Sequence, residues 1–243
     1  MAHEIRSPHD RSNPRDIQQM FNAIAPTYDK LNHLLSFGLD IKWRQRAIRE
    51  FNYGGTYLDI AAGSGDVSFD MMELHPTRIV SVDFAVEMLA VFKDKLEQKK
   101  GIGVIDLLSC DALALPFVEE TFDGTIVAFG MRNFADRLQS LKEMLRVLKP
   151  GGTSVVLELT KPRKPFVSQA YSLYANVGLP LLGKIISRHN SAYRYLPDSI
   201  AQFPAPAEFC SLMDQAGFTE VRAVPLTFGT ATVFVGKKLA ARK

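Results

Sequence analysis

The segment 58–66, LDIAAGSGD, constrains this chain more than any other, because an apolar strand there runs directly into a glycine loop. Gly63 and Gly65 lack a Cβ, so we expect the loop backbone to press against a bound nucleotide. The next apolar stretch, residues 78–82, ends at Asp83, where a carboxylate is placed to accept hydrogen bonds from both hydroxyls of a ribose. The pattern predicts a ligand that contains adenosine.

Two classes of nucleotide use such a loop. A dinucleotide fingerprint requires a third glycine or alanine at position 68, which is Ser68 here, and it places a diphosphate at the start of the following helix. Asp66 is expected near that diphosphate and would repel it, whereas it would tolerate a cation such as the sulfonium of S-adenosylmethionine. A nicotinamide-dependent oxidoreductase is therefore disfavoured. A tight strand-to-helix turn without a ligand stays open, since a short Gly-x-Gly is a weak signal.

A third apolar run, residues 103–108, leads to Asp111, which we expect to hold the amino group of adenine. In open α/β sheets ligands bind at the carboxyl ends of the strands, and three consecutive strands here end in a glycine loop, an acid and another acid. Each aspartate taken alone is also typical of a helix N-cap or a turn. Together the three strand ends predict one nucleotide site.

Composition agrees with a single intracellular α/β domain over residues 1–243. Of the 243 residues 47% are hydrophobic, which is enough for a sizeable core, and neither the two cysteines nor the histidines form a metal-binding pattern. The net charge of +3 is not concentrated in basic runs with interleaved aromatics, so we expect no nucleic-acid partner. The polar residues 1–16 and the lack of a long apolar run predict a cytoplasmic protein.

Strand and helix patterns alternate along the chain, and they predict a mostly parallel sheet with helices on both faces and an antiparallel terminal pair. The expected strands are 56–61, 78–83, 103–108, 123–129, 153–159, 220–224 and 230–236, and the expected helices are 40–51, 67–74, 86–98, 136–148 and 207–216. Residues 14–51 are interpreted as an N-terminal helical cap. Residues 161–205, rich in proline and aromatic residues, break the alternation and are interpreted as an irregular insertion that covers the substrate.

Four blocks carry a resemblance to a known family. They are YDKLN at 28–32 with Ser36 and Trp43 following, FGMRN at 129–133, RVLKPGG at 146–152 continued to ELT at 158–160, and YRYLPDSI at 193–200. With them the chain resembles the class I S-adenosylmethionine-dependent methyltransferases of Rossmann-like fold, and more narrowly the C-methyltransferases of menaquinone and ubiquinone biosynthesis. The resemblance extends from about residue 20 to residue 235.

The resemblance implies S-adenosylmethionine as cofactor and a polyprenylated quinol as substrate, with a ring carbon attacking the sulfonium methyl group. Contacts to the cofactor are implied at Ser64, Asp83, Asp111 and Ala112, while Asp59, Gly63 and Gly65 would shape the methionine end. Members of the family often carry serine at position 128. Ala128 can offer the cofactor only its backbone.

A phenolate makes the neighbouring ring carbon nucleophilic, so the site requires a group that favours loss of the phenol proton. Arg132 is the candidate catalytic residue, either stabilising the phenolate or orienting a water that acts as base, because a guanidinium is itself a poor proton acceptor. Its alternative is a structural ion pair, for example with Asp136. Tyr28 and Asn32 are interpreted as a flap on the substrate side, together with Asn133, although simple packing is equally compatible with Tyr28.

The head group is expected to be demethylmenaquinol, with a 2-methoxy-6-polyprenyl-1,4-benzoquinol as the alternative. A cofactor-binding scaffold without activity also remains open. Prenylated quinols reside in the bilayer, so we expect peripheral contact with the inner face of the cell membrane, with the apolar segment 166–186 as docking surface or as ordinary core. Self-association into a homo-oligomer is left open.

Overall fold

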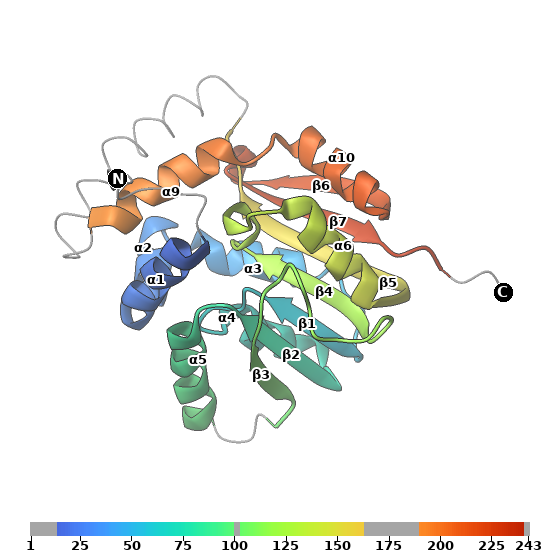
Figure 1. Ribbon diagram of the computed structural model, residues 1–243, viewed down its shortest axis with the longest axis horizontal. Helices are drawn as coiled ribbons and strands as arrows, with labels where there is room; N and C mark the ends of the chain where they lie inside the picture. Colours follow the sequence, from blue (N-terminus) through green and yellow to red (C-terminus); the bar gives the residue numbers. More distant parts are fainter. Residues whose placement is uncertain (1–13, 100–102, 163–189, 241–243) are drawn as a thin grey trace, which may run out of the picture.

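The computed structural model describes residues 14–99, 103–162 and 190–240. Its centre is one seven-stranded sheet in the order β3-β2-β1-β4-β5-β7-β6 (Figure 1). The strands are β1 Thr56–Ile60, β2 Arg78–Asp83, β3 Ile105–Ser109, β4 Phe122–Ala128, β5 Leu148–Leu159, β6 Thr219–Leu226 and β7 Ala231–Lys237. The predicted fold class is confirmed.

The strand order reverses beside β1, and this reversal places the site. Strand β1 pairs in parallel with β2 on one side and with β4 on the other, so that Leu58 lies opposite both Val80 and Thr125. Strand β7 runs antiparallel to β5 and to β6, as predicted for the terminal pair. The chain thus leaves β1 and β4 in opposite directions across the sheet, and this divergence opens a crevice at their carboxyl ends.

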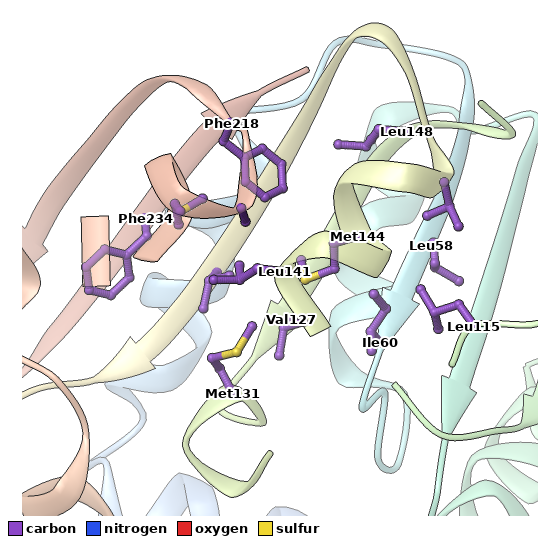
Figure 2. Close-up of a cluster of buried hydrophobic side chains, with 14 of the residues drawn as sticks. Leu58, Ile60, Leu115, Val127, Met131, Leu141, Met144, Leu148, Phe218 and Phe234 are labelled. Atoms are coloured by element: carbon purple, nitrogen blue, oxygen red, sulfur yellow. The ribbon is translucent and has the colours of Figure 1, made fainter. Parts of the chain in front are cut away.

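Both faces of the sheet are buried, which explains why the central strands are almost continuously apolar. Alternate residues point to opposite faces: Leu58 and Ile60 join the core beneath α6 and α10, whereas Tyr57 joins the core beneath α3 and α4. Figure 2 shows the first of these cores, in which Leu58, Ile60 and Val127 of the sheet lie near Met144 of α6. The two cores fix the strand ends that carry the site.

The helices follow the predicted alternation. Helices α1 Pro14–Ile24, α2 Tyr28–Leu35 and α3 Leu39–Ile48 precede the sheet, with the 3-10 turn η1 Ala25–Thr27 between the first two. The remaining elements are α4 Asp66–Asp70, η2 Met71–Leu74, α5 Val86–Gln98, η3 Met131–Asn133, α6 Arg137–Val147, α9 Asn190–Gln202, α10 Pro206–Ala216 and η5 Thr227–Gly229. Only the helix predicted over 86–98 has the bounds that the sequence indicated; most other boundaries shift by one to three residues.

The N-terminal helices form a cap beyond the carboxyl ends of the strands, on the same side as α9 (Figure 1). Helix α1 packs on α5 through Phe21, Ile24 and Met88. The Gln18 Nε2 also donates a hydrogen bond of 2.6 Å to the carbonyl oxygen of Phe84, just after β2. The cap is therefore attached to the strand ends that frame the crevice.

Two sequence predictions of local structure are wrong. Residues 190–202, expected to be irregular because of their prolines, form helix α9 with Pro197 inside it. Ile200 and Phe203 are buried at its end, and this tertiary packing outweighs the hydrogen bond that proline cannot make. Strand β5 begins at Leu148 instead of 153, because Leu148 already pairs with Phe122 of β4. The predicted docking segment 166–186 lies outside the described residues.

Candidate active site

A cavity opens at the carboxyl ends of β1, β2 and β4, where the strand order reverses. The volume of this cavity is about 130 Å³, and Ile17 and Phe21 of α1 line one side of it. Seven of the residues that the sequence predicted for the site line this cavity: Tyr28, Gly63, Asp83, Asp111, Ala112, Ala128 and Asn133. Strand ends far apart in the sequence thus meet in one place.

Asp83 is held by backbone amides at the end of β2. Its Oδ2 accepts a hydrogen bond of 2.8 Å from the N–H of Gly63, and its Oδ1 accepts one of 2.7 Å from the N–H of Ala85. Burial raises the pKa of this carboxyl, and the amide hydrogen bonds oppose the rise. Each carboxylate oxygen keeps acceptor capacity, so Asp83 is oriented for the two hydroxyls of a ribose.

Asp111 occupies the corresponding place after β3. Its Oδ1 accepts a hydrogen bond of 2.9 Å from the N–H of Leu113, which fixes the side chain at the cavity wall beside Ala112. The neighbouring Cys110 is packed against the core, and burial, followed by the charge of Asp111, raises the pKa of its thiol to about 11. This part of the cavity carries an oriented acceptor beside a neutral thiol, which suits the amino group of adenine.

Glycine is needed at positions 63 and 65 of the loop for two different physical reasons. Gly63 has a φ of +56°, and a Cβ built there would meet only the Tyr28 ring, at 3.7 Å, so its missing side chain leaves room in the cavity. Gly65 has a φ of +92°, and a Cβ there would lie 2.2 Å from the ring of Phe92 on α5. The missing Cβ of Gly65 therefore makes room for Phe92 and not for a ligand, while a contact between Gly65 and the cofactor stays a prediction.

Asp59 does not line the cavity but lies behind it, on the other face of the sheet. It is buried under α4, where its Oδ2 accepts a hydrogen bond of 2.6 Å from Ser68, whose hydroxyl also lies 2.7 Å from that of Ser81. The other oxygen, Oδ1, is buried and has no hydrogen-bond partner among the described residues. Burial, reinforced by the charge of Asp83, raises the pKa of Asp59 to about 7.

Ser64 and Asp66 face the cap helices. The Ser64 hydroxyl donates a hydrogen bond to Asp29 of α2, and Lys95 of α5 lies 2.5 Å from Asp29 and 3.0 Å from Asp66. Arg44 lies 3.6 Å from Asp66 as well. Asp66 lies outside the cavity lining, and both cations also pair with other aspartates, so the repulsion between Asp66 and a diphosphate stays a prediction. Ser68 remains the departure from the dinucleotide fingerprint.

Tyr28 and Asn32 lie together on α2, as the flap interpretation requires. Tyr28 reaches the cavity edge, its ring meets that of Phe21 edge-on with centroids 6.0 Å apart, and its hydroxyl is hydrogen-bonded to Asn32. Burial raises the pKa of the Tyr28 hydroxyl, while the positive charge of Arg132 opposes this rise. Asn32 thus supports Tyr28 and does not itself line the cavity.

Arg132 is buried in η3, directly after β4, and forms an ion pair with Glu158 of β5. Its Nη1 lies 2.8 Å from Glu158 Oε1, and its backbone N–H donates a hydrogen bond of 3.0 Å to Glu158 Oε2. Asp136, the partner suggested from the sequence, is instead the N-cap of α6 and accepts a hydrogen bond of 2.9 Å from the N–H of Gln139. That suggestion is wrong, and a catalytic role of Arg132 stays a prediction.

Sequence reasoning missed two residues of this neighbourhood. Tyr195 of α9 donates a hydrogen bond of 2.6 Å to Asn133 Oδ1, and Asn133 lines the cavity. Glu158 is fully buried in an otherwise apolar strand, which was a usable signal, because buried carboxylates are nearly always paired. Nothing in the sequence pattern indicated that Tyr195 meets Asn133. The structure therefore adds a polar cluster beside the nucleotide-type cavity.

Comparison with known proteins shows the family of this chain. The family model of the ubiE/COQ5 methyltransferase family matches residues 9–238. The chain is 44% identical over 226 residues to a ubiquinone/menaquinone biosynthesis C-methyltransferase of Geobacter sulfurreducens, covering 91% of this chain and 88% of the relative. It is 46% identical over 222 residues to the demethylmenaquinone methyltransferase of Thermus thermophilus, covering 90% of this chain and 100% of the relative.

Solved structures match the fold. A methyltransferase from Thermotoga maritima that depends on S-adenosylmethionine superposes with a TM-score of 0.63 at 19% identity, covering 90% of this chain and 99% of the other. Another from Aquifex aeolicus gives a TM-score of 0.61 at 16% identity, covering 93% and 99%. The cavity, with acceptors set for an adenosine at the ends of β2 and β3, fits the cofactor of these proteins. The chain belongs to the ubiE/COQ5 methyltransferase family and is a methyltransferase that uses S-adenosylmethionine.

Proposed function

We propose that this enzyme methylates a ring carbon of a polyprenylated quinol, and that its substrate is demethylmenaquinol, which it converts to menaquinol. The observation that carries the proposal is the full-length relationship to the Thermus thermophilus protein, a demethylmenaquinone methyltransferase, at 46% identity. The geometry supports it, because a polar cluster containing two arginines adjoins the cofactor cavity at the end of β4. Asn133 lines the cavity and accepts a hydrogen bond from Tyr195, so it connects the cavity to this cluster.

The residues of the site supply binding, orientation and charge. When bound, S-adenosylmethionine supplies an electrophilic methyl group on a sulfonium. Asp83 and Asp111 are oriented to hold its adenosine, and Gly63 leaves room for its approach. Tyr28 covers the cavity from α2 and excludes water, and holding the ring carbon about 3–3.5 Å from the methyl group supplies much of the rate.

The alternative head group is a 2-methoxy-6-polyprenyl-1,4-benzoquinol, the corresponding substrate of ubiquinone biosynthesis. It requires the same methyl transfer to a ring carbon beside a phenolate. The name of the Geobacter sulfurreducens relative includes both pathways, which keeps this alternative open. A naphthoquinol has an additional fused ring, so its head group requires a wider binding site than the benzoquinol does.

The first experiment measures transfer of label from radiolabelled S-adenosylmethionine to short-chain forms of both quinols under reducing conditions. Wild type and Asp83→Ala are compared side by side. We expect label in the naphthoquinol, and we expect Asp83→Ala to lose it because the ribose loses its acceptor. Label in neither quinol, with cofactor binding intact, would refute the quinol assignment and leave only the methyltransferase class.

We also propose that the enzyme contacts the membrane surface peripherally, since a prenylated substrate resides in the bilayer. Phe37, between α2 and α3, and Phe228, in η5, are 75% and 72% exposed, and both lie at the carboxyl edge of the sheet. Their φ angles of +54° and +57° are unfavourable for bulky residues, so the backbone conformation at both positions has an energetic cost. Among the described residues no helix is long and apolar enough to cross a membrane.

Sedimentation with anionic liposomes tests this contact. We expect Phe37→Ser combined with Phe228→Ser to reduce liposome binding without loss of the folded state. The matched control is Tyr53→Ser, because Tyr53 is 78% exposed but precedes β1, at the opposite edge of the sheet. Equal binding by wild type and the double variant would exclude this surface as the docking site.

A further inference from the structure

The cluster beside the cavity contains two arginines, Arg132 and Arg137, and one carboxylate, that of Glu158. Arg132 is paired with Glu158, whereas Arg137 forms no ion pair with any carboxylate of the described residues. The Nη2 of Arg137 donates a hydrogen bond of 3.0 Å to the carbonyl oxygen of Arg132, so the two residues are in direct contact. The cluster therefore carries one positive charge more than Glu158 can balance.

Both arginines also have a buried donor that is unused. Within the described part of the chain, the Nε atoms of Arg132 and of Arg137 are buried and have no hydrogen-bond acceptor. Buried donors are nearly always satisfied, because a donor without a partner loses its hydrogen bonds to water and gains none in return. Two such donors on neighbouring guanidinium groups indicate an acceptor that is supplied by a ligand.

The surroundings of Arg137 orient it and do not neutralise it. Its guanidinium lies over the ring of Phe203, 5.6 Å from the centroid. Burial lowers the pKa of Arg137, and the charges of Glu158 and Tyr195 only partly oppose this shift. Arg137 is also the first residue of α6, where the helix dipole disfavours a cation. None of these surroundings supplies a negative charge that pairs with Arg137 among the described residues.

The cluster connects to the cavity through Asn133. Tyr195, whose hydroxyl is bonded to Asn133, interacts electrostatically with both Arg132 and Arg137. Asn133, Phe134 and Ala135 line the cavity on the short segment between the two arginines. An aromatic ring that enters beside Asn133 thus comes near the unbalanced charge of Arg137.

We propose that Arg137 is the residue that holds the phenolate oxygen of the quinol, while Arg132, already neutralised by Glu158, positions Arg137 through its carbonyl group. This inference rests on the proposed function. The phenol loses its proton to solvent, and the phenolate pushes electrons into the ring. The ring carbon forms its bond to the methyl group as the bond between methyl and sulfur breaks. The proton of that ring carbon then leaves to solvent, its bonding electrons return to the ring, and aromaticity is restored.

The proposal is tested first without turnover, with a 2-hydroxy-3-alkyl-1,4-naphthoquinone, whose anion is coloured. We expect wild type to bind the anion and to lower the pKa of the bound ligand, as seen in its absorbance. Arg137→Gln should weaken anion binding by about tenfold or more, and Arg137→Lys should restore part of it because the charge is kept. Lys142→Gln, an exposed change of the same charge on α6, is the control and should bind like wild type.

The second measurement is the pH profile of methyl transfer. If Arg137 stabilises the phenolate, the acid limb of the kcat profile moves to higher pH in Arg137→Gln, whereas a purely structural role lowers kcat equally at every pH. The proposal is overturned if Arg137→Gln binds the anion as tightly as wild type, or if wild type does not bind it at all. Altered anion binding together with no label in either quinol would preserve the anion site and refute the proposed reaction.

Discussion

The two halves of the site are built from different kinds of contact. On the cofactor half, carboxylates at strand ends hold nearby backbone amides, as Asp83 holds Gly63 across the neighbouring strands β1 and β2. On the substrate half, charged and polar side chains pair with one another across long separations, 26 residues for Arg132 and Glu158 and 62 residues for Asn133 and Tyr195. Sequence patterns at strand ends therefore predict the cofactor half of the site, whereas the contacts of the substrate half become visible only in the folded structure.

The largest effect is expected from the buried pair of the substrate half. Glu158→Leu leaves Arg132 buried without its partner, and we expect it to lower the free energy of unfolding by about 3–5 kcal/mol. Combining it with Arg132→Met should cost much less than the sum of the two single changes, because neither member of the pair is then left buried without the other. Urea unfolding of all four proteins measures this coupling, and additive losses would show that the pair is not a unit.

A somewhat smaller effect is expected in the glycine loop. Gly65→Ala forces a Cβ against Phe92 at a left-handed φ, and we expect a loss of about 3 kcal/mol in the free energy of unfolding. Gly38→Ala, at a φ of +71° with nothing within 4 Å of the new Cβ, is the control and should lose only about 1–2 kcal/mol. Equal losses in urea unfolding would mean that the Phe92 ring yields and that Gly65 has no packing role.

Asp59 makes a distinctive contribution to pH dependence. Its pKa is about 7 in the folded protein against 3.8 for an ordinary aspartate, so between these values the unfolded chain releases a proton that the folded protein retains. Stability therefore falls as pH rises through this window and is level above it. Relative to Asp59→Asn, wild type should lose about 2–3 kcal/mol of unfolding free energy between about pH 5 and about pH 8. Parallel pH curves for the two proteins would contradict the shift.

The smallest change in stability is expected at Ser64, where a substitution shows whether the hydroxyl contacts the cap helix α2 or the cofactor. Because the Ser64 hydroxyl is bonded to Asp29, Ser64→Ala should cost about 1 kcal/mol of stability and leave cofactor affinity unchanged. Isothermal titration with S-adenosylmethionine and urea unfolding check the two parts, with Asp29→Asn as the matched change on the other side of the bond. A loss of cofactor affinity by about tenfold would instead restore the contact that the sequence predicted.

The sequence allowed the sheet and most of the cavity to be predicted for a physical reason. Short apolar runs and turn residues fix strand ends, and a parallel sheet brings those ends to one edge, so Asp83 and Asp111 meet once the strands are recognised. The face of the sheet to which a given strand residue points is harder to predict. Asp59 lies one strand residue from a site-facing position, and alternation turns it under α4.

What could not be predicted depends on elements that pack from a distance. The sequence suggested Asp136, four residues away, as an example of a partner for Arg132, although β5 brings Glu158 alongside η3. The role of Gly65 depends on Phe92, which α5 delivers from 27 positions later in the chain. Helix α9 was missed because a proline inside a helix is judged from local propensity, while the burial of Ile200 is a tertiary effect.

Helix α1 has a consequence for the timing of the catalytic cycle. Ile17 and Phe21 belong to the same cavity wall as Asp83, and α1 is held to α5 by a small apolar contact and to the loop after β2 by the Gln18 hydrogen bond. If the demethylated cofactor leaves past α1, this helix has to separate from α5 first. Where this separation sets the pace, good and poor quinols will be turned over at the same maximal rate, and a pre-steady-state burst will distinguish them.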